Sequence, residues 1–225
     1  MNWCRKRIMR IMYIEMKHGR PELSSPALRE MVRKDNFDFN AGGADVDEIE
    51  RAFRIVEVAK RVVPAVCDID ENKGKSGVVM AITKKETGFP LLTVQIGEVD
   101  DPDTTYGSDG KRGKYTDFAN RKALVLQLNP DFVASSENHT LPEEKRMKSI
   151  TGIEIPGGAI VARDWIISVS AFKNPNMDAA TAIAIAAGAG LIGIDEAERF
   201  AHDPRVNCPE FMLHEDKILV ENILH

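Results

Sequence analysis

Two pairs of short apolar segments constrain the fold of this chain more than any other feature of its sequence. The first pair is GVVMAIT, residues 77–83, and PLLTVQIG, residues 90–97. The second pair lies within GGAIVARDWIISVSAF, residues 157–172, where Arg163 and Asp164 separate two apolar runs. All four runs have strand length and are rich in β-branched residues, which favour extended backbone. Because the connection within each pair is short, the sequence predicts two antiparallel hairpins.

Helical segments precede, separate and follow the hairpins. In each of them, apolar or small residues recur at helical spacing. The segments are 46–63, with Asp45 and Glu48 as a capping box and Pro64 helping to end the helix; 115–129, with Ala119, Ala123 and Leu126 on one face; and the alanine-rich run after Asp178, its expected N-cap.

This order of elements predicts a single α/β domain of the α+β type over residues 44–194. Residues 1–43 are expected to form an N-terminal arm and residues 195–225 a C-terminal extension. The polar connection over residues 131–151 is long enough to be a functional loop.

Composition argues against several kinds of partner. With a formal net charge of −5 and 43% hydrophobic residues, neither a nucleic acid nor an acidic membrane is expected. No segment reaches the roughly 18 apolar residues of a membrane span. The 3 cysteines are far apart, which predicts no disulfide framework and no zinc site and favours a cytoplasmic location. For the basic, apolar residues 1–20 we favour a loose or partner-packed extension over an amphipathic helix at a membrane surface.

The segment GAGLIG, residues 188–193, matches the glycine spacing of a dinucleotide-binding turn. That turn requires a strand before it, a helix after it and several more strands to build the binding crevice, but only residues 194–225 follow. The alternative is a helix whose small residues pack closely on the sheet, with Gly188 and Gly190 near its end. We favour this packing interpretation.

Several motifs together resemble the GlcG/HbpS-type family of haem-binding proteins. They are SGVVMAITKKETGFPLL (76–92), Asp109-Gly110 followed by TDFANRKA (116–123), and IPGGAIVARDWIISVSAF (155–172) before an alanine-rich helix. The matching positions are Asp109, Gly110, Thr116, Ala119, Lys122, Ala123, Gly157, Gly158, Val169 and Ser170. Ser168 and Ala171 stand where the family motif Ile-Gly-Val-Ser-Gly has glycine. The likeness covers residues 45–193.

The resemblance implies an antiparallel sheet of about five strands flanked by helices, with profilin-like layering, in a homo-oligomer. Family members are associated with haem or related tetrapyrroles, with glycolate or diol utilisation, or with redox sensing. The first hypothesis is therefore a protein that binds a small molecule, haem or another flat anionic cofactor. Two others stay open: an enzyme of small hydroxy or oxo acids, and a structural or assembly subunit.

Haem requires an axial donor, an apolar slot and cations for its propionates. His139, the histidine inside the family-like region, is the expected donor. The other candidates, which offer cations for carboxylates, rings for stacking and a hydroxyl at a matching position, are Arg121, Lys122, Tyr106, Tyr115 and Thr116. The alternative is a solvated loop histidine, a solvated helix face and ordinary loop tyrosines. No catalytic residue and no metal site is predicted.

Overall fold

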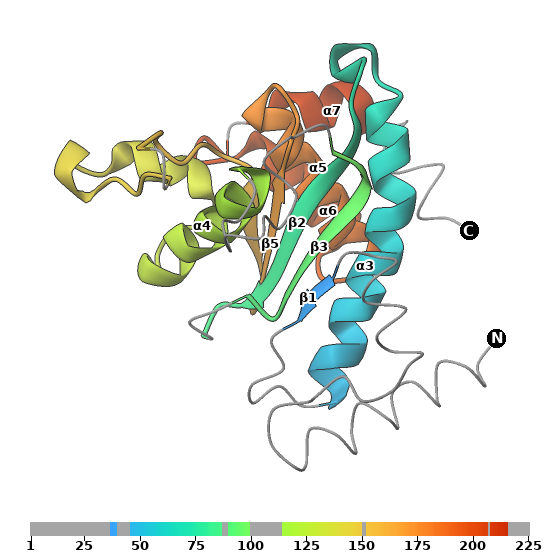
Figure 1. Ribbon diagram of the computed structural model, residues 1–225, viewed down its shortest axis with the longest axis horizontal. Coiled ribbons are helices and arrows are strands. Elements are labelled where there is room, and N and C mark those ends of the chain that lie inside the picture. The colour runs from blue at the N-terminus through green and yellow to red at the C-terminus, as the bar shows by residue number, and fades with distance from the viewer. Residues whose placement is uncertain are drawn as a thin grey trace, which may run out of the picture.

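The computed structural model describes residues 37–39, 46–86, 90–99, 114–149, 152–206 and 208–215 (Figure 1). Its sheet has the strand order β1-β3-β2-β5-β4, and all neighbouring strands are antiparallel. The strands are β1 (Phe37–Phe39), β2 (Ser76–Lys84), β3 (Leu92–Glu98), β4 (Ala159–Ala162) and β5 (Trp165–Ser170). β2 with β3 and β4 with β5 are the two predicted hairpins. The antiparallel sheet and the α+β class are therefore confirmed.

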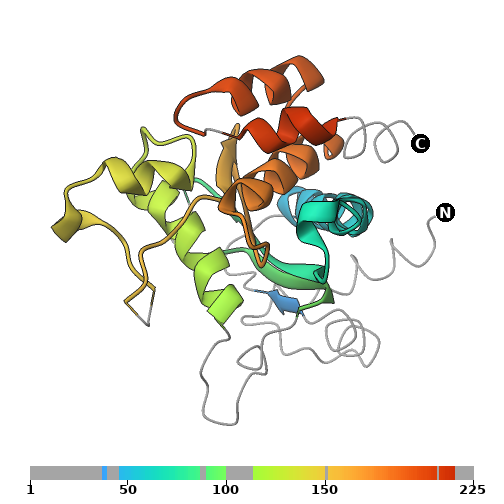
Figure 2. The same ribbon diagram turned by 90° about the horizontal axis from the view of Figure 1, so that it is seen from above.

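Helices cover both faces of this sheet (Figure 2). α4 (Lys114–Leu128) packs on one face, and α3 (Val46–Cys67) and α5 (Pro175–Gly188) pack on the other. Alternate residues of β2 serve the two layers, since Val78 and Met80 lie in the core with α3 and α5, whereas Val79 and Ala81 contact Ala119 of α4. Because both faces of the central strands are buried, these strands are continuous apolar runs.

Two short helices after α5 complete the apolar core. α6 (Ile194–His202) and α7 (Pro209–Glu215) both contact α5. Ala197, Ala201 and Phe211 belong to the same buried cluster as the sheet residues. The expected C-terminal extension therefore contributes side chains to the core of the domain. All residues of α5 from Met177 to Ala187 are buried, so its small residues serve contacts within the chain.

Two details of the helices correct the sequence predictions. Pro64 lies inside α3, which continues to Cys67, because burial of Val63 and Val66 holds the helix on the core past the proline. Asp178 is not the N-cap of α5. Asn174 takes that position and its side chain accepts a hydrogen bond from the backbone N–H of Asn176.

The N-terminal region is described only in part. The short strand β1, which the sequence analysis did not predict, lies within the expected arm and pairs with β3. Asp45 of the expected capping box and the basic residues 1–20 lie outside the described residues. None of the helices that the structure describes is long and apolar enough to cross a membrane.

The segment GAGLIG follows a helix and not a strand. α5 ends at Gly188, and Gly190 has a φ of 69°. The N–H of Gly190 bonds the carbonyl of Ala187, and that of Leu191 bonds the carbonyl of Ala186, both at 2.9 Å. This pair of bonds is a Schellman motif, in which glycine provides the left-handed residue that ends a helix. The packing interpretation is therefore confirmed.

Between α4 and β4 the chain forms a projecting lobe, yellow in Figures 1 and 2. It contains two 3-10 helices, η2 (Ser135–Thr140) and η3 (Glu143–Lys145), and a β-bridge between Lys148 and Glu154. We call residues 135–149 and 152–155 the η2–η3 lobe. At its base, Ala134 pairs with Ile160 and so covers part of the edge strand β4.

Candidate functional site

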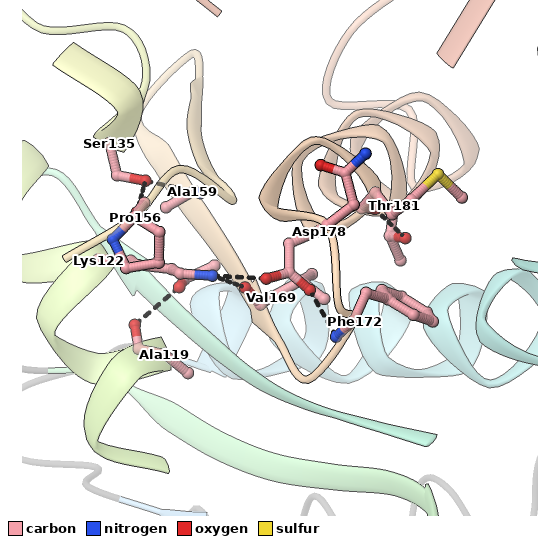
Figure 3. A network of polar contacts seen from close by, with 12 residues as sticks. Ala119, Lys122, Ser135, Pro156, Ala159, Val169, Phe172, Asp178 and Thr181 are labelled. Carbon is pink, nitrogen blue, oxygen red and sulfur yellow. Dashed lines mark hydrogen bonds and ion pairs between the residues drawn. The ribbon is translucent and has the colours of Figure 1, made fainter. Parts of the chain in front are cut away.

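Lys122 of α4 and Asp178 of α5 form a buried ion pair on the inside of the domain (Figure 3). Lys122 Nζ donates to Asp178 Oδ2 at 2.7 Å and to the carbonyl oxygen of Val169 at 2.7 Å. Asp178 Oδ1 accepts a hydrogen bond from the backbone N–H of Phe172 at 3.1 Å. The pair therefore connects α4, the end of β5 and the first turn of α5.

The backbone around this pair is tightly fitted. Gly158 has a φ of 119°, and a Cβ atom there would lie 2.6 Å from both Lys122 Nζ and the Cβ of Asp178. Ala171 has a φ of 145°, in the region that favours glycine. Glycine at position 158 is thus a steric requirement of the ion pair.

Burial affects the protonation of both partners. Desolvation lowers the pKa of Lys122 and raises the pKa of Asp178, while the attraction between the two charges acts in the opposite direction on each. The Lys122 side chain is 0% exposed, so a ligand carboxylate in solvent does not reach its ammonium in this conformation. This geometry supports a structural role for the pair, because its bonds hold α4, β5 and α5 in position.

Three other sequence candidates lie on or near α4. Thr116 is buried in the first turn of the helix. Tyr115 is partly exposed, and its hydroxyl accepts a hydrogen bond from Lys75 Nζ at 3.4 Å, with the same ammonium 5.4 Å from the ring centroid. Arg121 Nε donates to Asp117 at 2.7 Å, and its Nη1 donates to the carbonyl oxygen of Lys148 at 3.0 Å. Tyr106 lies outside the described residues.

The contact with Lys148 connects Arg121 to the lobe that carries His139. Lys148 pairs with Glu154 in the β-bridge, and Glu154 Oε1 lies 2.8 Å from His139 Nδ1. The structure thus places Arg121 and His139 on one region of the molecule. Lys122, by contrast, is directed into the interior, away from solvent.

His139 is an exposed side chain on a well-supported loop. Its neighbour Asn138 is 0% exposed, and its amide donates to the carbonyls of Met147 and Ile155 and accepts from the N–H of Met147. Glu137 caps the start of η2 by accepting from the backbone N–H groups of Val133 and Ala134. These bonds fix the backbone immediately before His139.

A carboxylate and a cation lie beside His139. Arg146 Nη1 lies 3.6 Å from the same Glu154 oxygen that His139 contacts. Ile153, adjacent to Glu154 in the chain, is 50% exposed although it is large and apolar. His139 and Arg146 thus share one carboxylate, so an oriented imidazole and a guanidinium lie close together.

A separate surface groove lies beside α6. Its lining residues are Val133, Glu196, Arg199, Phe200, Asp203 and Arg205. Arg205 is held by Asp203 at 2.6 Å, and Arg199 Nε donates to the carbonyl oxygen of Asp195 in its own helix. Charges of both signs line the groove, so they select no particular class of ligand.

Sequence reasoning missed two of the carboxylates that bind the candidate residues. Asp178 was assigned to a helix cap and Glu154 was not singled out. Lys122 shares one helical face with Ala119 and Leu126, and this spacing was a signal that its side chain is buried. Its partner had no such signal, because Asp178 is 56 positions away in the chain.

In comparisons with known proteins, no family model matches the chain, and neither a curated protein nor a solved structure matches it significantly.

Proposed function

We propose that this protein binds a flat anionic cofactor, haem being the expected one, on the η2–η3 lobe, with His139 Nε2 as the axial ligand. The observation that supports this most is the 2.8 Å contact between His139 Nδ1 and Glu154 Oε1. Metal-bound histidines in proteins generally donate their second ring N–H to a carboxylate or carbonyl, which fixes the ring and its tautomer. Within the described part of the chain, Nε2 of His139 has no hydrogen bond.

Other residues of the lobe and of the neighbouring helix α4 carry groups that haem uses. A porphyrin supplies four nitrogen ligands to its iron, so the protein has to supply only axial donors, and one histidine suffices for binding. Arg146 and Arg121 offer guanidinium groups for the propionates. Ile153 is a large apolar side chain that the lobe exposes. When bound, haem would supply redox or ligand-binding chemistry at its iron.

A hemin titration of the purified protein, followed by absorbance, tests the proposal. We expect a saturable, shifted Soret band for the wild type and at least a tenfold weaker affinity for His139→Ala. The matched control is His202→Ala, which removes another exposed histidine, at the end of α6. Equal hemin affinity of His139→Ala and wild type would show that His139 is not the axial ligand.

Several finer expectations stay predictions beside this proposal. They are the profilin-like character of the layering, assembly into a homo-oligomer and a cytoplasmic location. An enzymatic role for Lys122 and Arg121 in holding a small acid is less favoured, because the Lys122 ammonium is bonded inside the domain.

A further inference from the structure

The η2–η3 lobe is held together by bonds of its own. The side-chain amide of the buried Asn138 bonds backbone groups of Met147 and Ile155. The backbone N–H of Ser149 donates to the carbonyl oxygen of Ile153 at 2.6 Å. Segments with such internal bonding open and close locally as cooperative units. The lobe can therefore change its position as one piece, and the contacts at its base decide whether it does.

The base of the lobe lies around Ser135, which is 0% exposed. Ser135 Oγ accepts a hydrogen bond from the backbone N–H of Ala159 at 3.0 Å and donates to the carbonyl oxygen of Pro156 at 3.3 Å (Figure 3). These two bonds bring the first residue of the lobe against the chain that follows its last residue. Between their partners lies the segment Gly157–Gly158.

This segment also contacts the buried ion pair. A Cβ atom on Gly158 would lie 2.6 Å from Lys122 Nζ and 2.6 Å from the Cβ of Asp178. The Gly158 carbonyl oxygen accepts from the N–H of Val169 at 2.8 Å, and the Val169 carbonyl oxygen accepts from Lys122 Nζ at 2.7 Å. The backbone at the base of the lobe thus covers the pair, so a displacement of Gly158 changes the burial of both charges.

A second connection between the pair and the lobe runs through α4. Arg121 precedes Lys122 in this helix, and its Nη1 donates to the carbonyl oxygen of Lys148 in the lobe at 3.0 Å. Lys122 holds α4 against the end of β5, and Arg121 holds the lobe against α4. The position of the lobe therefore depends on the pair through two sets of contacts.

The charge balance of the pair affects how strongly the base stays closed. When both charges are present, each compensates the other, whereas a single charge that stays buried without its partner is costly. Hydration relieves that cost, and displacement of the backbone that covers the pair admits water. An uncompensated charge therefore favours an open base, and a compensated pair favours a closed one.

We propose that the Lys122–Asp178 pair is a latch for the η2–η3 lobe. With both charges present the base at Gly157–Gly158 stays closed, and loss of one charge opens the lobe while the sheet stays folded. His139 and Glu154 both belong to the lobe, so they move together when it opens. This control does not depend on which ligand the lobe binds.

Amide hydrogen exchange of the full-length chain, followed by mass spectrometry, tests the latch. In Lys122→Met we expect the amides of residues 137–149 to exchange about tenfold faster than in wild type, because the Asp178 carboxylate has lost its cation. Low concentrations of urea should change this rate little, since a local opening exposes less surface than global unfolding. Lys122→Met combined with Asp178→Asn removes both charges and should return the lobe toward the wild-type rate.

The matched control is Phe211→Ala, which truncates a buried side chain of α7 without changing a charge. It should lower global stability and leave the exchange rate of the lobe near that of wild type. Equal lobe exchange in Lys122→Met and Phe211→Ala would overturn the latch, because the pair would then contribute to overall stability alone. Fast lobe exchange that persists in the double variant overturns it as well. If Lys122→Met does not fold, Asp178→Asn leaves the Lys122 ammonium uncompensated and permits the same comparison.

Discussion

The buried pair of Lys122 and Asp178 has a cost that a surface ion pair largely avoids, namely the loss of hydration of both charges. Each charge loses hydration on burial, and the loss is offset by the partner charge and by the hydrogen bonds to Val169 and Phe172. Loss of one partner leaves the other buried and uncompensated, whereas loss of both charges removes the cost of desolvation as well. The pair therefore acts as a unit, and its members have to be tested together.

Lys122→Met is expected to lower the free energy of unfolding by about 3–5 kcal/mol, because it leaves the Asp178 carboxylate buried without a cation. Lys122→Met combined with Asp178→Asn should recover a large part of this loss. Urea unfolding of the two single variants and the double variant measures the coupling. Additive effects of the two substitutions would contradict a coupled pair.

The same variant has an expected pH dependence. Burial raises the pKa of Asp178 above its ordinary value of 3.8, and removal of the Lys122 ammonium takes away the charge that lowers it. The folded state then binds a proton more tightly than the unfolded state, so stability is present at low pH and is lost as the pH rises above about 4. Lys122→Met should therefore be less destabilising, relative to wild type, at pH 4 than at pH 7.

Cys208 is expected to be an unreactive thiol in the folded protein. It is 0% exposed and donates to the carbonyl oxygen of Asn176, and burial raises its pKa to about 12. Because the thiolate is the reactive form, a thiol reagent at pH 8 should modify it only after unfolding. The measurement uses a chain with Cys4→Ser and Cys67→Ser, with and without urea. Modification at equal rates in both conditions would contradict the burial.

At the scale of elements, the sequence predicts those helices and strands that depend on neighbouring residues, but not those that depend on contacts between distant residues. The hairpins and the helices α3, α4 and α5 followed from periodicity and turn residues, which depend on neighbours in the chain. The strand β1 is three residues long, too short for periodicity to reveal, and the contacts of α6 and α7 with α5 depend on distant residues. The pairing of His139 with Glu154 likewise needed the folded lobe.

Gly190→Ala tests the end of α5. Position 190 has a φ of 69°, and alanine there is expected to cost about 1 kcal/mol of unfolding free energy, because a side chain disfavours left-handed backbone. Gly157→Ala is the matched control, since Gly157 lies outside the helices, its φ is not in the left-handed region, and an added Cβ would lie 3.4 Å from its nearest neighbour, the Cβ of Ser136. Equal effects of the two substitutions on urea unfolding would contradict a glycine requirement at the helix end.

At the scale of the whole molecule, one buried cluster connects residues from α3 to α7. The sheet contributes one face to this cluster, and α5 lies between the sheet and the last two helices. Residues after 194 therefore belong to the same packed core as the sheet and do not form an independent unit. The C-terminal helices are expected to unfold together with the sheet, as one cooperative unit.

Phe211→Ala tests this cooperativity. Phe211, in α7, is 0% exposed, and its truncation is expected to cost about 3–5 kcal/mol through lost burial and a residual cavity. In a chain with Trp3→Phe, fluorescence reports Trp165, which is buried in β5, far along the chain from the substitution. If α7 is part of one cooperative unit, the urea midpoint of the Trp165 signal falls by the amount that corresponds to this whole loss of unfolding free energy. It then coincides with the midpoint of helix loss by circular dichroism.

The exposed substitution Arg199→Ala on α6 is the control. It should shift both midpoints very little, because surface changes are usually within about 0.5 kcal/mol. An unchanged Trp165 midpoint in Phe211→Ala, with earlier loss of part of the helical signal, would make the C-terminal helices a separate unit.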